Sequence, residues 1–105
     1  MNSDSLPLDR ALLSMQRALW EIVTPELRAV VLRVSGVKVH ARFVYDMPIT
    51  DDILEIVDEA DTEALADLPD GSRTDFTAEY LPPDQPRELS DDEVWVFLRR
   101  EPGTT

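Results

Sequence analysis

The chain has 105 residues, 43% of them apolar, which suffices for one domain with a single hydrophobic core. It carries 22 acidic against 10 basic residues, a net charge of −12, and no cysteine, which excludes disulfides, thiol catalysis and thiolate metal sites. No run approaches the roughly 18 apolar residues of a membrane span, and the start MNSDSLPLDR lacks a signal-peptide pattern. We therefore expect a cytoplasmic single domain over residues 1–105, with frayed ends at residues 1–5 and in the tail EPGTT, 102–105 above all.

The acidic residues are concentrated in the middle of the chain. Residues 43–72 hold ten acidic residues and no basic one, whereas residues 1–42 hold six basic residues against four acidic ones. Such a field repels nucleic acid and anionic membranes, and it attracts a cationic protein. We therefore expect a protein partner, and neither a nucleic acid nor a membrane.

The first expected element is an amphipathic helix over residues 7–23. Its apolar side chains share one narrow arc at helical spacing: Leu8, Leu12, Met15, Leu19, Ile22 and Val23. Thr24-Pro25 ends it, because proline pushes the preceding residue out of the helical region. Leu13 and Trp20 lie about 100° from the centre of this arc, so they either wrap a sheet edge or form an exposed anchor for a partner.

Two β-branched runs, LRAVVLRV and VKVHARFVYD, predict strands over 27–34 and 37–45, joined by a two-residue turn at Ser35-Gly36. On the core face this turn pairs Val34 with Val37, Leu32 with Val39, Val30 with Ala41 and Arg28 with Phe43. The other face pairs Arg33 with Lys38, Val31 with His40 and Ala29 with Arg42, which sets like charges opposite each other. We expect that second face to be exposed or to meet a partner.

A second helix is predicted in DDILEIVDEADTEALAD, residues 51–67, which holds eight carboxylates and no base. Thr50 is a good N-cap, and Asp51 and Asp52 suit the first turn, where the helix dipole favours negative charge. The apolar stripe consists of Ile53, Val57, Ala60, Ala64 and Leu68. The opposite half consists of Asp51, Asp52, Glu55, Asp58, Glu59, Glu63 and Asp67. The stripe is expected to pack and the acidic half to face out.

Pro69-Asp70-Gly71 marks a turn, and the alternation in DFTAEYL predicts a third strand over 74–81. The proline-containing loop PPDQPRELSDDE follows, and EVWVFLRR, residues 93–100, predicts a fourth strand with Trp95 and Phe97 on one face. The order α-β-β-α-β-β predicts an α+β two-layer sandwich. Two helices then pack on one face of a four-stranded, largely antiparallel sheet whose strand order one sequence does not determine.

Catalytic and cofactor chemistry finds little support in the residues. His40 is the sole histidine, and as a general base it would need an orienting carboxylate, which Asp75 or Glu79 supplies only if the third strand lies alongside. A solvated strand histidine is the commoner case. The helical acids lack the loop spacing and glycine of a calcium site, and no glycine-rich phosphate motif occurs. We expect no enzyme, metal or cofactor.

A second hypothesis uses the open sheet face. Arg33, Lys38, Arg42 and Arg99 beside Trp95 and Phe97 would form a platform on which RNA bases could stack. The net charge opposes it. Asp75 and Glu79, if their strand is adjacent, would neutralise the same bases, so a salt-bridged surface is favoured.

The acidic helix is either a solvated face, which is the usual meaning of a charge run, or a binding surface. Its like-charge neighbours Asp51/Glu55, Glu55/Glu59 and Glu59/Glu63 each cost a few tenths of a kcal/mol, and no Glu–Lys pair relieves them. The acids also extend into the proline loop and the SDDE turn. Both features favour a surface that is kept for its field.

Several segments together resemble a known family. The plan α-β-β-α-β-β, the phrase VTPELRAV before a hairpin, FVYDMPITDDILEIVDEADTEALADL and the closing WVFLRRE are similar to small immunity proteins of bacterial contact-dependent inhibition and related polymorphic toxin systems. The resemblance covers most of the chain. It implies a cytoplasmic inhibitor that binds one cognate toxin domain, often a nuclease with a basic cleft, as a monomer in a heterodimer. Such families share no catalytic motif, so no residue role is carried over.

From the acidic surface we predict that carboxylates occlude a cationic cleft by mimicking phosphate spacing. The expected contacts are Asp51, Glu55, Asp58, Glu59 and Glu63, with Asp84, Asp91 and Asp92 as weaker candidates. Two alternatives remain. An acidic regulator that mimics nucleic acid would act on a DNA-binding protein, and an enzyme, ligand binder or RNA binder on the sheet face would depend on His40, Arg42 or Trp95.

Overall fold

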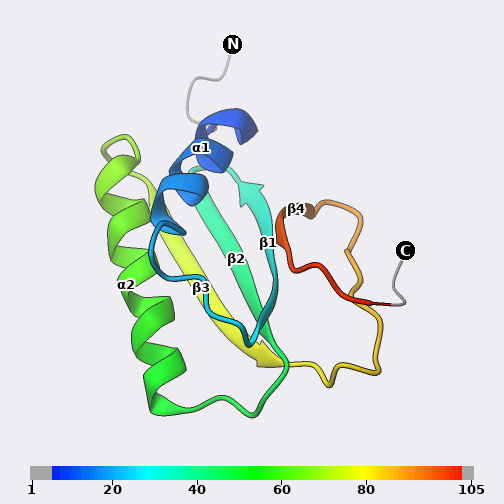
Figure 1. Ribbon diagram of the computed structural model, residues 1–105. Helices are drawn as coiled ribbons and strands as arrows, with labels where there is room; N and C mark the ends of the chain where they lie inside the picture. Colours follow the sequence, from blue (N-terminus) through cyan, green and yellow to red (C-terminus); the bar gives the residue numbers. More distant parts are fainter. Residues whose placement is uncertain (1–5, 103–105) are drawn as a thin grey trace.

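The computed structural model describes residues 6–102, so the expectations for residues 1–5 and 103–105 lie outside it. Two helices and four strands follow each other in the predicted order (Figure 1). Their bounds are α1 Leu8–Ala18, β1 Leu27–Ser35, β2 Lys38–Tyr45, α2 Asp51–Asp67, β3 Arg73–Tyr80 and β4 Val94–Leu98. No helix in this part of the chain has the length and apolar character needed to cross a membrane.

The sheet is mixed, with strand order β3-β2-β1-β4. β1 pairs antiparallel with both β2 and β4, but β3 runs parallel to β2, from Lys38 opposite Arg73 to Tyr45 opposite Tyr80. The expectation of a largely antiparallel sheet therefore needs correction at β3. β3 is parallel to β2 because α2 crosses over and returns the chain to the end of the sheet at which β2 begins. An α+β fold is confirmed, with one parallel pair.

The β1–β2 hairpin forms as predicted, but the predicted register is wrong by two residues. Val34 lies opposite Val39, and the turn consists of Gly36 and Val37. Gly36 has φ of +63° and Val37 has no positive φ. Glycine at the first turn position with positive φ is the demand of a type II′ turn. A shift of two residues leaves the side chains from Ala29 to Val34 on their predicted faces.

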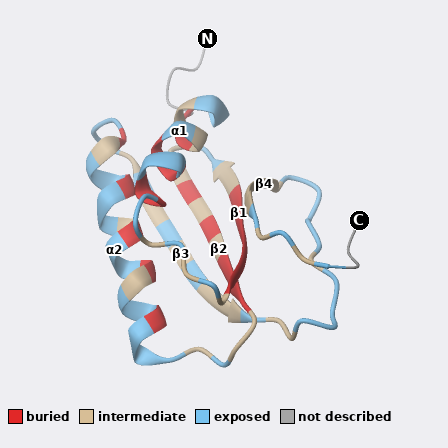
Figure 2. Cartoon of the chain, in the orientation of Figure 1, coloured by how far each residue is buried: buried red, intermediate tan, exposed pale blue. Residues whose placement is uncertain are grey.

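The main core lies between the helices and one face of the sheet. Leu32, Val39 and Phe43 contribute from β1 and β2, and Phe76 packs against the same cluster from β3. The rings of Phe43 and Phe76 pack at a centroid distance of 5.8 Å, tilted by 38° to each other. Figure 2 shows the buried residues of α2 on the side that faces the sheet. Both helices add residues to this one cluster, as the predicted layering requires.

α1 is shorter than predicted and is rotated relative to the predicted stripe. It ends at Ala18. The prediction extended it to residue 23 because the apolar spacing continues through Leu19 and Ile22, but these two residues pack on the core from the turn that follows the helix. Leu8 and Val23, expected in the core, are both 43% exposed. The buried face is made by Ala11, Ser14, Met15, Ala18 and Leu19. Its small residues let α1 lie close to α2.

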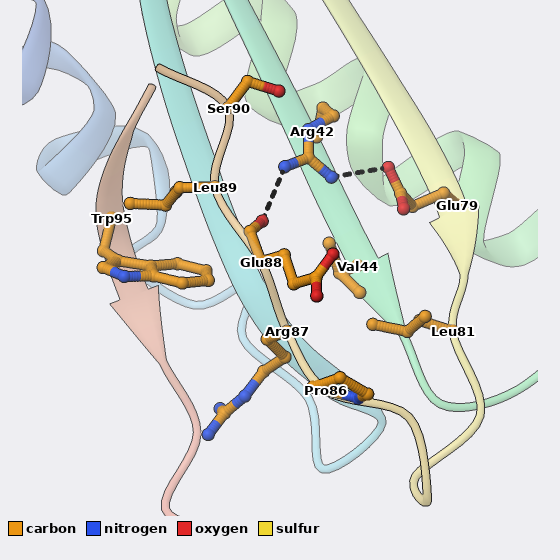
Figure 3. Close-up of a pocket in the computed structure, with 10 residues that line it drawn as sticks. All are labelled: Arg42, Val44, Glu79, Leu81, Pro86, Arg87, Glu88, Leu89, Ser90 and Trp95. Carbon is orange, nitrogen blue, oxygen red and sulfur yellow. Dashed lines mark hydrogen bonds and ion pairs between the residues drawn. The ribbon is translucent and has the colours of Figure 1, made fainter. Parts of the chain in front are cut away.

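The second face of the sheet is not open as expected. Ala29, Val31 and Val44 are buried there, outside the main core. The irregular residues 81–93, which we call the crossing segment, run over this face, and Figure 3 shows part of them passing across the strands. The two-layer arrangement is thus confirmed only in part, since a third partial layer of loop covers the back.

A buried arginine holds this crossing segment and the C-terminal residues in place. Arg28, expected opposite Phe43 on the core face, is fully buried; its Nε and Nη2 donate to Glu101 at 2.8 and 2.9 Å, and its Nη1 donates to the carbonyls of Leu81 and Pro82. A register irregularity between Leu27 and Ala29 displaces Arg28 from the predicted pairing. Glu101, expected at the start of a frayed tail, is anchored by these bonds.

Candidate functional site

α2 forms as the sequence predicts. The Thr50 hydroxyl accepts a hydrogen bond from the backbone N–H of Ile53 at 3.2 Å, which caps the helix, and Asp51 and Asp52 occupy the first turn. The predicted stripe is confirmed in full. Its members Ile53, Val57, Ala60, Ala64 and Leu68 are all buried. The opposite half of the helix is pale blue in Figure 2 and therefore exposed.

The carboxylates on that exposed half are unpaired. Within residues 6–102, no ion pair or side-chain hydrogen bond engages the carboxylates of Asp51, Glu55, Asp58, Glu59 or Glu63. Asp67 is the exception to the predicted outward set. It accepts hydrogen bonds from Ser14 at 2.9 Å and from Arg17 at 2.9 Å, and Ser14 is the largest cause of its lowered pKa. The five predicted helix contacts therefore face solvent without a counter-charge from the described chain.

Trp20 is the second residue after α1 and is 77% exposed. Its backbone N–H bonds to the carbonyl of Arg17 at 3.2 Å, and the next residue, Glu21, has φ of +71°, a left-handed conformation that non-glycine residues rarely adopt. Ile22 then bonds back to Leu19. This tight, internally bonded turn presents the indole ring to solvent. Of the two fates considered for Trp20, the structure shows the exposed one; Leu13, 46% exposed, shares it.

Trp20 and the acidic helix border one groove. Ala18, Trp20, Glu21 and Ile22 line it from the end of α1, and Glu55, Asp58, Glu59, Thr62 and Glu63 line it from α2. In Figure 1 the segment after α1 runs alongside α2, which brings these residues together. The groove therefore contains one aromatic ring, five carboxylates and no base. Four of the five predicted helix contacts belong to it; Asp51, in the first helical turn, lies outside its lining.

The weaker candidates lie elsewhere. Asp84, Asp91 and Asp92 are exposed and belong to the crossing segment, on the face of the sheet opposite α2. Asp92 is also within 3.8 Å of Arg33. The structure therefore does not bring these three residues together with the helix carboxylates into one surface.

The back face holds a second hollow, drawn in Figure 3, in which charges are paired. The Arg42 guanidinium donates two hydrogen bonds to Glu93 at 2.8 Å and one to Glu79 at 2.9 Å. These bonds from Arg42 lower the pKa of Glu93 to about 2. The predicted neutralisation of sheet-face bases by Glu79 is confirmed here.

The RNA-stacking platform is not assembled. A register irregularity between β1 and β4, at which Val96 of β4 is left without a partner, sets Phe97 opposite Val30 on the core face and Trp95 opposite Val31 on the back face. The expectation that both rings share one face is wrong for this reason. Arg99 donates to Asp46 at 2.7 Å and to Glu101 at 2.9 Å, and it is likewise committed.

His40 does lie beside a carboxylate, because β3 runs along β2. Its Nδ1 is 3.5 Å from Asp75, which stands opposite it in the parallel register. Its other neighbour across the sheet is Arg33, and no serine, threonine or tyrosine hydroxyl donates a hydrogen bond to it in the described chain. This pair supplies an orienting group without a nucleophile, which favours the solvated strand histidine.

Among residues 6–102, no three acidic or histidine side chains converge as ligands for a metal ion, because α2 spaces its acids along a surface. Sequence reasoning missed Glu21 and Ile22 as groove residues, and Glu101 as a structural carboxylate. Glu21 is the third residue after α1 ends, so a correct helix end would have placed it beside Trp20.

In a scan against protein families, the family described as MafI2 immunity protein matches residues 9–101, nearly the whole chain. No curated protein matches the chain.

Proposed function

The chain belongs to the MafI2 immunity protein family, and on this premise we propose that it neutralises its cognate toxin by covering a basic cleft with the outer face of α2. An immunity protein has a toxin as its partner. The finer elements, namely a basic toxin, nuclease chemistry at the covered cleft, a one-to-one complex and action in the cytoplasm, are parts of this proposal.

One observation carries it: the unpaired carboxylates Glu55, Asp58, Glu59 and Glu63 line a single groove, and no base among residues 6–102 pairs with them. Elsewhere the chain uses its arginines to neutralise acids, as Arg42 does with Glu79 and Glu93. A charged surface that the fold leaves without counter-charge attracts an oppositely charged partner and raises its association rate.

The proposed inhibition needs no catalysis by this protein. Carboxylates on successive helical turns offer acceptor oxygens to Lys and Arg side chains that would otherwise hold phosphates, and each pair that loses water at the interface slows dissociation. The toxin's substrate is then excluded by the body of α2. Immunity proteins are generally not enzymes, and the proposed mechanism requires no enzymatic activity from this chain.

The test is a triple reversal, Glu55→Lys, Glu59→Lys and Glu63→Lys, in cells that express the cognate toxin. We expect protection to be lost and toxin binding to fall by at least about 100-fold, because three attractive contacts become repulsive. The matched control reverses Asp70, Asp84 and Asp91 to Lys, with the same change in net charge. None of these residues lines the groove, so this variant should still protect, which would also remove Asp84 and Asp91 from the expected contacts.

Association kinetics provide the second measurement. The association rate of the unaltered protein should fall steeply between low and physiological salt, because the Debye length shortens from about 30 Å at 0.01 M to about 8 Å at 0.15 M. If the triple reversal folds and protects, the α2 face is excluded as the contact, whatever the family match says of the partner.

A further inference from the structure

We propose that the groove between the end of α1 and α2 is the seat of one arginine side chain of the toxin, whose guanidinium stacks on Trp20 and bonds to the carboxylates opposite. This role rests on the proposed toxin binding. It adds the identity of the side chain that is recognised and makes Trp20 the anchor of the interface.

The aromatic wall is the first argument. Trp20 is the most exposed large apolar side chain in the described part of the chain, at 77%, and the turn that carries it is fixed by backbone bonds from Trp20 to Arg17 and from Ile22 to Leu19. Leaving an indole ring in water forgoes the free energy of its burial. Tryptophan is also among the residues that most often dominate binding at an interface.

The charge of the opposite wall selects the occupant. Glu55, Glu59 and Glu63 stand on successive turns of α2 with Asp58 beside them, and Glu21 adds a fifth carboxylate from the Trp20 side. A second copy of this chain, with net charge −12, would be repelled. The chain segments beyond residues 6–102, MNSDS and GTT, contain no lysine or arginine that could fill the groove. The occupant is therefore a cationic side chain from another protein.

The pairing of a ring with carboxylates distinguishes arginine from lysine. A guanidinium is planar, stacks on an aromatic face and offers two parallel N–H groups to one carboxylate, whereas an ammonium is a strongly hydrated point charge. A groove with Trp20 on one side and Glu55 and Glu59 on the other presents both requirements at once. A lysine would satisfy only the carboxylates.

The binding test compares Trp20→Ala, Trp20→Phe and Leu13→Ala by titration calorimetry with the toxin domain. Trp20→Ala should weaken binding about 10- to 100-fold, and Trp20→Phe, which keeps a ring face, by less than about threefold. Leu13→Ala is the matched control, because Leu13 is exposed on α1 but does not line the groove, and it should leave binding within about twofold. Circular dichroism checks that all three fold.

A second measurement needs no toxin. Nα-acetyl-arginine amide and Nα-acetyl-lysine amide are titrated, at equal ionic strength, into the ¹⁵N-labelled protein, and the indole N–H signal of Trp20 is followed. Arginine should shift this signal more than lysine does, while the indole signal of Trp95, on the other sheet face, stays as the internal reference. Equal shifts from both cations, or none, would overturn the arginine seat.

The arginine seat and the proposed function can be contradicted separately. If the triple lysine reversal of α2 abolishes toxin binding but Trp20→Ala binds within twofold of the unaltered protein, the arginine seat is wrong and the proposed function stands. If the triple reversal also binds normally, the α2 surface itself is wrong, and the arginine seat falls with it.

Discussion

Acidic residues serve opposite purposes in two regions of this molecule. Around β4 and the crossing segment, each of Glu79, Glu93 and Glu101 is bonded to an arginine, and these bonds connect residues far apart in sequence. On the outer face of α2, the carboxylates of Glu55, Glu59 and Glu63 have no such partner within the described chain. The same chemical group thus holds the fold together in one region and is left to face solvent in the other.

This difference shows why net charge alone is a weak guide. Several arginines pair with acids and so connect distant parts of the fold: Arg28, Arg87 and Arg99 all approach Glu101, and Arg17 pairs with Asp67. The outer face of α2 has no such counter-charge within the described chain, so its negative charge remains. Substitutions in the two regions should separate stability from partner binding, and three predictions test that separation.

The largest effect is expected at the buried pair. Glu101→Gln should lower the free energy of unfolding by about 3–5 kcal/mol, because it leaves the Arg28 guanidinium buried without its carboxylate. Urea denaturation followed by circular dichroism measures this. Adding Arg28→Met should recover part of the loss, since the charge that lacks a partner is then gone. Glu55→Gln, on the exposed helix, is the control and should stay within about 0.5 kcal/mol. Equal losses at both sites would contradict the comparison.

Acid should weaken the paired region over a defined range. Hydrogen bonds from Arg42 lower the pKa of Glu93, and those from Arg28 lower the pKa of Glu101, from 4.5 to about 2 in each case. Because the folded-state pKa is the lower one, this stabilisation is complete above pH 4.5 and disappears as pH falls to about 2. Each group contributes about 3 kcal/mol at neutral pH.

Urea titrations at steps between pH 7 and pH 2.5 measure this dependence. Glu93→Gln should flatten the curve by the contribution of one group. A variant whose stability varies with pH as steeply as that of the unaltered protein would show that the Arg42 pair does not act in this way.

The smallest effect is expected on α2 and has the opposite sign. Glu59→Lys converts two repulsive i,i+4 pairs, with Glu55 and with Glu63, into attractive ones. The protein should therefore become more stable by about 0.5–1 kcal/mol. Toxin binding should nevertheless weaken, because a groove carboxylate is reversed. Asp84→Lys, on the other face, should change neither quantity appreciably. A Glu59→Lys variant that is both more stable and equally protective would place the contact elsewhere.

Local patterns predicted what local physics decides. The stripe from Ile53 to Leu68 and the Thr50 cap each depend on residues within one or two helical turns of each other, and both are present in the structure. The hairpin was predicted, but its register depended on whether Gly36 takes the first or the second turn position, a difference of one residue in the turn and two in the pairing. Turn geometry decided it.

What escaped prediction depends on contacts between distant residues. The parallel β2–β3 pair requires knowing where α2 returns the chain, and the bond between Arg28 and Glu101 spans 73 residues. The groove was missed for a related reason. Trp20 and the acids of α2 were each singled out, but their meeting depends on α1 ending at Ala18 and on how the two helices pack.

Glu21 extends this reasoning to protein engineering. Its backbone, at φ +71°, has a conformation for which glycine is the preferred residue, yet its side chain adds a carboxylate to the groove. A procedure that selects substitutions for thermal tolerance would choose glycine at this position and lysine on α2. Each choice would raise the melting temperature while removing negative charge from the groove, so a thermostabilised variant of this protein should be a poorer inhibitor.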